Sequence, residues 1–244
     1  WDAIECYEGS SESALRDCVI KYGGRGNEDA NIEIHESAPL ISGCLVSESG
    51  AEGLNLWNSE ATIEFCEIRD NEKNGIDTWA NHPSAPTIRS CVFIDNRTVM
   101  WQAVNCYPVF EGLNASVVTA TDGSKRNGIR LGGGHITTSG VWNQTFVPYF
   151  AEDDIDVEAG TELTITPGVI VKFDVRNVGI EILGTLTATN TVFTSIRDDA
   201  VGGDTNGDGP GYASRGDWDA LEFREGSSNS VLQGCTVRYG GLGT

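Results

Sequence analysis

SALRDCVI, residues 13–20, decides the fold, because variants of this phrase recur along the chain. Each variant predicts a short strand with a bend, since apolar and polar residues alternate within it. The first five copies follow one another at steps of 26, 22, 25 and 22 residues. The other copies are PLISGCLV (39–46), ATIEFCEI (61–68), PTIRSCVF (86–93), PVFEGLNA (108–115) and SVLQGCTV (230–237).

Aligning the six phrases gives three columns of mostly apolar residues. A period of 22 to 26 residues that holds short strands and turns is typical of a solenoid, in which stacked coils form one continuous core. The columns therefore predict residues that lie above one another inside the molecule. They contain Leu15, Ile41, Ile63, Ile88, Phe110 and Leu232; then Cys18, Cys44, Cys66, Cys91, Leu113 and Cys235; then Ile20, Val46, Ile68, Phe93, Ala115 and Val237.

The pattern resembles the repeat of the right-handed parallel β-helix family, in the pectate-lyase-like superfamily. That repeat has an apolar residue, then Cys or Asn three positions later, then a further apolar residue and a turn of the Asn-Gly-Ile type. The turn is represented by EGLNL (52–56), NGIDT (74–78) and NGIRL (127–131). Residues 154–173, 184–195, 198–209 and 216–223 resemble the opening section of β-helical repeat domains in large bacterial and archaeal surface proteins. The resemblance implies an all-β solenoid of about nine to ten coils.

A longer repeat surrounds the short one. Residues 1–27 and 218–244 are identical at 15 of 27 aligned positions, which gives a period of 217 residues. We therefore expect one period of a longer tandem array or processed precursor. Residues 1–123 would form the last coils of one β-helix repeat and residues 151–244 the first coils of the next. Between them, residues 124–150, with a run of three glycines at 132–134, fit no coil and predict a capping seam.

Composition bounds the function. Of 244 residues, 39% are hydrophobic and 8% aromatic, which favours a folded chain over a disordered one. Sixteen basic and 36 acidic residues give a net charge of −20, which disfavours binding to nucleic acid or to anionic membranes. Cations are the expected partners. The sequence also contains no apolar stretch long enough to predict a membrane span.

The seven cysteines allow three interpretations: a metal array, disulfides, or small apolar residues in a narrow interior. Residues in register on neighbouring coils have Cβ atoms about 4.8 Å apart, which is beyond the roughly 3.5–4.5 Å of a disulfide. The sequence contains no CxxC pair, so the spacing that is typical of a zinc site is absent. We therefore predict that the cysteines of the column are interior packing residues.

Residues 198–209, DDAVGGDTNGDG, predict a calcium loop. Asp204, Asn206 and Asp208 alternate before Gly209, as in the opening of a loop whose oxygens converge on a hard cation. The twelfth position is Arg215 instead of the bidentate Glu of an EF-hand, so Asp198 and Asp199 would complete the ligand set. We expect a structural Ca²⁺; the alternative is a solvated acidic turn.

An outward column of aromatic residues is predicted on the strands after the Asn-Gly turns. Alternation places His35, Trp57 and Trp79 on the outer face, with Trp101 close by and Asp77 in the neighbouring outward column. Such a face could bind or cleave glycans, or contact another protein. Alternatively, residues 124–150 or a neighbouring chain cover it.

The sequence therefore predicts a non-enzymatic, extracellular or cell-surface building block of a filament, sheath or adhesin that assembles end to end. The alternative is a carbohydrate-active β-helix module that binds or cleaves an acidic polysaccharide along the Trp57 and Trp79 face.

Overall fold

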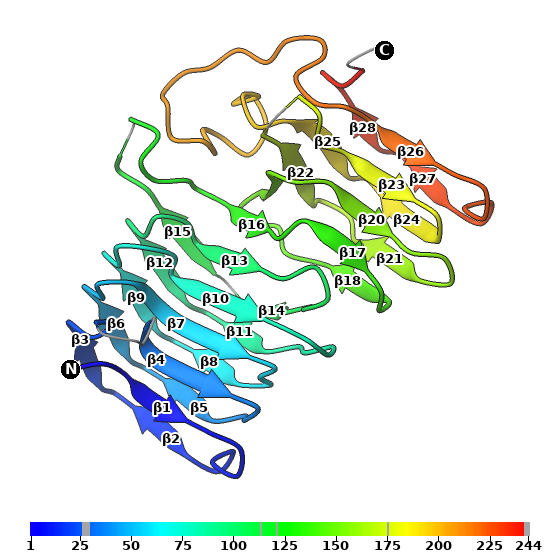
Figure 1. Cartoon of the computed structure of the whole chain (residues 1–244). Helices are drawn as coiled ribbons and strands as arrows, with labels where there is room; N and C mark the ends of the chain where they lie inside the picture. Colours follow the sequence, from blue (N-terminus) through cyan, green and yellow to red (C-terminus); the bar gives the residue numbers. More distant parts are fainter. Residues whose placement is uncertain (26–29, 113, 121, 175, 242–244) are drawn as a thin grey trace.

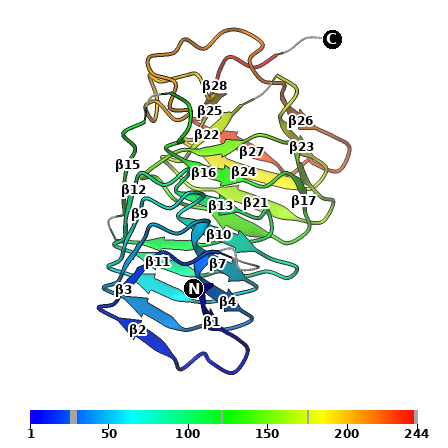
Figure 2. The ribbon, with the colours of Figure 1, turned by 60° about the vertical axis from the view of Figure 1, so that its left-hand side comes forward.

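A computed structural model describes residues 1–25, 30–112, 114–120, 122–174 and 176–241. The described chain consists of 28 strands and connecting turns, wound into one solenoid (Figure 1). Figure 2 shows the coils rising from the N-terminal end to the C-terminal end. Every pairing between strands is parallel, and each joins a strand to its counterpart in the next coil. The predicted parallel β-helix is confirmed.

One sheet, sheet I, runs the whole length of the solenoid and contains ten strands. Its strands are, in order, β1 (Ile4–Cys6), β4 (Ala30–His35), β7 (Glu52–Trp57), β10 (Ile76–Trp79), β13 (Met100–Gln102), β16 (Ile129–Leu131), β19 (Tyr149–Ala151), β22 (Ile170–Phe173), β25 (Val192–Ser195) and β28 (Thr236–Val237).

Two five-stranded sheets complete the first five coils. Sheet II contains β2 (Ala14–Arg16), β5 (Leu40–Ser42), β8 (Thr62–Glu64), β11 (Thr87–Arg89) and β14 (Val109–Glu111). Sheet III contains β3 (Val19–Lys21), β6 (Leu45–Ser47), β9 (Glu67–Arg69), β12 (Val92–Ile94) and β15 (Ala115–Val117).

Two four-stranded sheets complete the remaining four coils. Sheet IV contains β17 (Gly134–Ile136), β20 (Ile155–Val157), β23 (Ile180–Ile182) and β26 (Leu221–Phe223). Sheet V contains β18 (Gly140–Trp142), β21 (Glu162–Ile165), β24 (Thr185–Thr189) and β27 (Val231–Gln233). The count of coils is thus close to the nine to ten expected.

The segment 124–150, for which we predicted a capping seam, forms a coil of its own. Its strand β16 pairs with β13 on one side and β19 on the other, so sheet I passes through without a break. The other two faces change here, because sheets II and III end at β14 and β15 while sheets IV and V begin at β17 and β18. The segment is therefore a change of faces within a continuous solenoid.

The predicted cysteine column lies in the interior of the first coils. The Sγ atoms of Cys44, Cys66 and Cys91 each lie 3.5–3.6 Å from a carbonyl oxygen of the preceding coil. All seven cysteines are free thiols. A side chain at this position thus fills the interior and also donates to the backbone at the corner between sheets II and III.

The fifth coil departs from our alignment by one residue. The turn between β14 and β15 is one residue longer than its predecessors, so Ser116 pairs with Phe93, and the alignment of Ala115 with Phe93 is wrong. Asn114 takes the place of a cysteine: its Oδ1 accepts from the Cys91 amide at 2.8 Å and its Nδ2 donates to the Ile88 carbonyl at 3.4 Å. Leu113, which we had aligned with the cysteines, lies outside the described residues.

Candidate ligand groove on the ten-stranded sheet

An aromatic ladder runs along the outer face of sheet I. Strand register pairs His35 with Trp57 and Trp57 with Trp79. The rings of Trp57 and Trp79 stack with centroids 6.3 Å apart, and those of Trp79 and Trp101 lie 4.3 Å apart. Tyr7 extends the ladder by one coil, because its ring stacks on His35 at 5.0 Å. We call these five residues the ladder.

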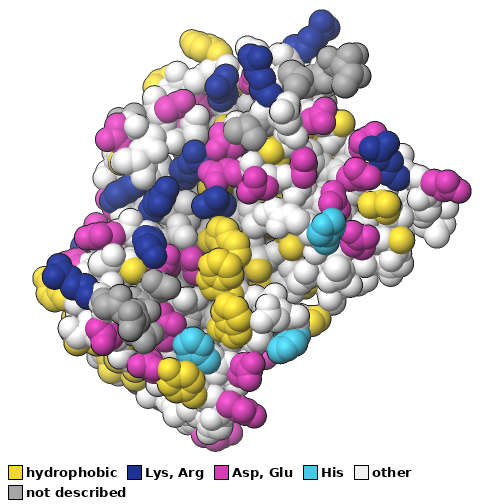
Figure 3. Space-filling model, in the orientation of Figure 1, with side chains coloured by type: hydrophobic (Ala, Val, Ile, Leu, Met, Phe, Trp, Pro, Cys, Tyr) yellow, Lys and Arg dark blue, Asp and Glu magenta, His cyan; other side chains and the backbone are white. Residues whose placement is uncertain are grey.

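The ladder is open to solvent along most of its length, as the column of large apolar side chains in Figure 3 shows. Trp79 is 41% exposed. Among the described residues, the segment 124–150 reaches the ladder at its Trp101 end, where a Cβ atom on Gly132 would lie 2.9 Å from the Trp101 ring. The interpretation that this segment buries the ladder is therefore limited to Trp101. Rings held in this way on a rigid sheet offer flat apolar faces to a ligand.

A groove of about 830 Å³ lies beside the ladder. Trp79 and Trp101 form one wall, and the turns that lead into the strands of sheet I form the other. Figure 3 shows basic and acidic side chains gathered next to the aromatic column. Its charged lining residues are Glu52, Glu72, Lys73, Asp77, Arg97, Arg126, Arg130 and Glu152.

Ion pairs fix most of the charged groups in this groove. Glu152 accepts from both Arg126 and Arg130, the latter at 2.7 Å, and Arg126 also contacts Asp174. Lys73 lies 3.2 Å from Glu52. The groove therefore combines aromatic faces with ordered guanidinium groups and carboxylates, in a chain whose net charge is strongly negative.

Asp77 is one of two buried acids of the groove: it is 6% exposed, and its neighbour Glu52 is 5% exposed. Burial, followed by repulsion from Glu52, raises the pKa of Asp77 to about 7. The Asn74 amide donates to its Oδ1 at 2.7 Å and opposes this rise, as do Lys73 and Arg130. At neutral pH this carboxyl group can consequently keep its proton and donate a hydrogen bond.

A family model described as the right-handed β-helix region matches residues 2–140, which is more than half of the chain. The chain belongs to the right-handed β-helix family. No curated protein and no solved structure matches it. The family assignment agrees with the coils seen directly in sheets I, II and III.

The acidic loop of this β-helix follows β25 and packs against the turn that precedes β16. The amides of Gly123 and Asn127 donate to the carbonyls of Gly207 and Thr205. The predicted calcium ligands face different partners: Asp204 accepts from the amides of Gly207 and Gly209, whereas Asp208 accepts from the Asn206 amide group. No three Asp, Glu, His or Cys side chains converge as a metal site requires within the described ranges.

A lysine lies beneath this loop. The Lys172 side chain is fully buried, and its ammonium donates to the carbonyls of Asp198 and Gly203 at 3.1 and 2.8 Å. Asp198 also accepts from Thr194 and Arg238, while Asp199 accepts from the Gly211 amide. The protein itself thus supplies positive charge to the loop. The Oδ1 of Asp199 and that of Asn206 are shielded and have no partner among the described residues, and the calcium site stays a prediction.

Sequence reasoning placed the tryptophans and Asp77 on one face but missed Tyr7, Arg126, Arg130 and Glu152. Tyr7 could have been found, since it follows Cys6 as His35 follows Ile34 in the strand pattern. The two arginines and Glu152 lie in or next to the segment that we excluded from the coils. None of the described residues forms a helix long and apolar enough to cross a membrane.

Proposed function

We propose that this chain is a structural repeat unit of an extracellular or cell-surface β-helical rod, such as a filament, sheath or adhesin, and that its copies stack end to end. One observation carries the proposal: the same coil occurs twice, with opposite edges open. Residues 1–24 form the first coil, and residues 218–241 repeat it at the other end of the solenoid.

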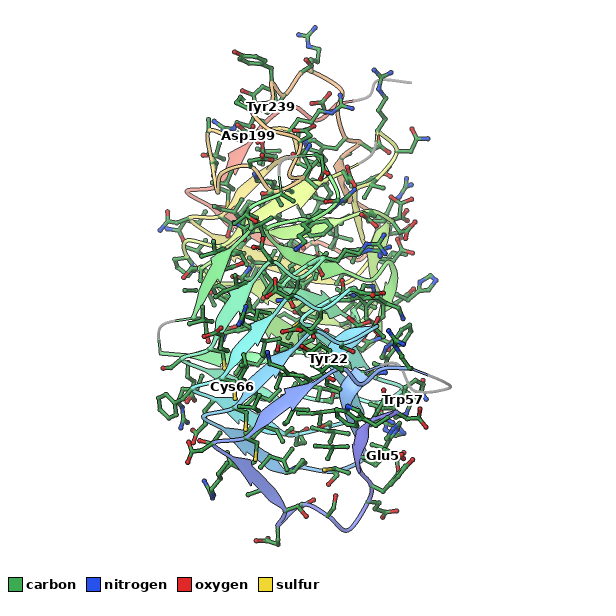
Figure 4. All side chains as sticks on the ribbon, turned by 90° about the vertical axis from the view of Figure 1, so that its left-hand side faces the viewer. Glu5, Tyr22, Trp57, Cys66, Asp199 and Tyr239 are labelled. Atoms are coloured by element: carbon green, nitrogen blue, oxygen red, sulfur yellow. The ribbon has the colours of Figure 1, made fainter. Side chains whose placement is uncertain are left out.

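The two coils have the same local structure. The indole Nε1 of Trp1 donates to the Lys21 carbonyl at 2.8 Å, and that of Trp218 donates to the Arg238 carbonyl at 2.8 Å. Tyr22 and its counterpart Tyr239 both have a left-handed backbone, with φ of 63° and 65°. Figure 4 shows these two tyrosines well separated along the axis.

Their surroundings differ in a complementary way. Trp1 is 54% exposed, whereas Trp218 is 1% exposed because Phe173 of the preceding coil covers it. Conversely, Cys6 is buried beneath the second coil, whereas its counterpart Phe223 is open at the far edge. In the proposed stack, a preceding copy would cover Trp1 as Phe173 covers Trp218, and a following copy would cover Phe223 as the second coil covers Cys6. Stacking would also pair both exposed strand edges.

A chain of two periods, residues 1–244 followed directly by residues 28–244, tests this proposal. The period from β1 to β26 contains 25 strands at three per coil, so the added ~8⅓ coils of ~4.8 Å each should lengthen the particle by ~40 Å in small-angle scattering. Backbone amides of residues 221–237 in the first copy should become protected from hydrogen exchange. Two separately moving bodies, with those amides still unprotected, would refute stacking. Leu232→Asp in the first copy, which places a charge at the junction, serves as the control and should abolish the protection.

The groove supports a second function, binding of an acidic polysaccharide. Sugar rings can stack on Trp79 and Trp101, and the guanidinium groups of Arg97, Arg126 and Arg130 can contact carboxylate or sulfate groups. Affinity electrophoresis in gels containing alginate, with dextran as the neutral comparison, tests it. Trp79→Ala should remove the retardation. Trp1→Ala, which removes an exposed tryptophan outside the groove, should retain it. Equal mobility in both gels would exclude this function.

A further inference from the structure

The repeated coil occupies different faces of the solenoid at its two occurrences. Strand β1 belongs to sheet I, but its counterpart β26 belongs to sheet IV. Likewise, β2 of sheet II corresponds to β27 of sheet V, and β3 of sheet III corresponds to β28 of sheet I. All three strands have thus moved by one face in the direction in which the chain winds.

The sharp corner of the coil confirms this shift independently of the alignment. In the first four coils, a two-residue turn between sheets II and III begins with a left-handed residue: Asp17, Gly43, Phe65 and Ser90, with φ between 51° and 65°. In the last coils, the equivalent two-residue turn leads from sheet V into sheet I. It begins with Asn190 or Gly234, with φ of 47° and 65°. Sheet I therefore takes over the role of sheet III.

Glycines make this shift possible in the sixth coil. In the first five coils a turn of at least four residues follows each strand of sheet I, but only Gly132 and Gly133 separate β16 from β17. A Cβ atom on Gly133 would lie 2.3 Å from the Asp153 side chain, and Gly134 has φ of 108°. The chain can turn directly into a new face here because these positions carry no side chain.

We infer that stacked copies present their aromatic ladders on successive faces of the rod, each turned by one third of a turn from the ladder before it. This inference rests on the proposed stacking. The ladder of a following copy would begin at Arg224, the counterpart of Tyr7, on the face of sheet IV. A period of ~8⅓ coils at ~4.8 Å each would return the ladder to its first face every ~120 Å, after three copies.

Such a rod would bind another copy of the chain at each end. On its sides, the ladder of each copy would bind a ligand of its own. Between one ladder and the next on a single face lie coils with other outward residues, such as the column of His135, Asp156, Glu181 and Glu222 on sheet IV. A single straight polymer would consequently meet a ladder on only one copy in three. Ligands bound to neighbouring copies would point away from the rod in three directions, which suits a cross-linking role.

The crystal structure of the two-period chain tests the inference. Viewed down the axis, the direction from the solenoid centre to Trp57, Trp79 and Trp101 of the first copy should differ by about 120° from the direction to the same residues of the second copy. Three faces per coil require this angle. A continuous solenoid with both ladders on one face would overturn this inference and leave stacking intact. Two solenoids that do not stack would instead refute the proposed function. Oriented rods of a six-period chain provide a second measurement, because their diffraction should contain a ~120 Å repeat in addition to the ~40 Å period.

Discussion

The first five coils and the last four share sheet I but are filled in different ways. In the first five, the interior repeats small and branched side chains, such as Ile41, Cys44 and Val46, at nearly constant spacing. In the last four, it contains large rings, among them Trp142, Tyr149 and Phe173. A short repeated phrase is sufficient to specify the interior of the first five coils. The interior of the last four depends on how particular large side chains pack against one another.

The two copies of the terminal coil give the largest expected contrast between these regions. Trp218→Ala should reduce the free energy of unfolding by about 3–5 kcal/mol, because it removes a buried ring stacked on Phe173 at 4.3 Å. Trp1→Ala, in the same local structure but at an open edge, should cost less than about 1 kcal/mol. Urea unfolding monitored by circular dichroism measures both. Equal losses would show that the two coils are not distinguished by their neighbours.

Asp77 in the first five coils and Lys172 in the last four are buried titratable groups that should give pH slopes of opposite sign. The pKa of Asp77 is raised to about 7, above its unfolded value of about 3.9, so the folded state holds the extra proton. Stability from this group is complete below pH 4 and is lost as the pH rises through 7. Asp77→Asn should therefore gain roughly 2–4 kcal/mol over the wild type between pH 4 and pH 8. Parallel stability curves for the two proteins would contradict the burial of this charge.

In the last four coils, burial lowers the pKa of Lys172 to about 8, below its unfolded value of about 10.4. The unfolded chain then holds the extra proton between these two values, so stability should rise with pH across that window. We expect the wild type to gain about 1–3 kcal/mol relative to Lys172→Met from pH 8 to pH 10. Denaturant unfolding at both pH values, compared with Lys73→Met as an exposed control, measures the gain. If the difference in stability between the wild type and Lys172→Met were the same at both pH values, the Lys172 ammonium would have to be exposed to water.

The calcium prediction gives the smallest expected effect and concerns the last four coils alone. If Ca²⁺ joins Lys172 in holding residues 198–209, EGTA should lower the melting temperature by about 2–4 °C, equivalent to about 1 kcal/mol. Asp204→Asn should remove most of that sensitivity. An unchanged melting temperature in both proteins would mean that Lys172 and the backbone amides alone order the loop.

The regular coils could be predicted from sequence because stacked neighbours repeat the same columns. Ile41, Ile63 and Ile88 lie in register as aligned. The alignment failed where a turn gained one residue before Asn114, since a single sequence does not reveal on which side of a turn an insertion falls. The sixth coil was missed for another reason: Gly132 and Gly133 replace a turn, and their role depends on the distant Trp101 and Asp153. Likewise, no local pattern marks Lys172 as buried.

The buried cysteines allow local opening to be measured separately in successive coils of the first half. Cys66 and Cys91 are 2% and 0% exposed, and burial raises the pKa of Cys44 to about 11. Burial keeps reagents away from Cys66 and Cys91, and the raised pKa keeps Cys44 in the unreactive thiol form, so these side chains should not react while their coil is closed. The rate at which a maleimide modifies each cysteine would then measure how often the coil around it opens by local unfolding. Mass spectrometry of the modified peptides would give this opening frequency for each coil along the axis.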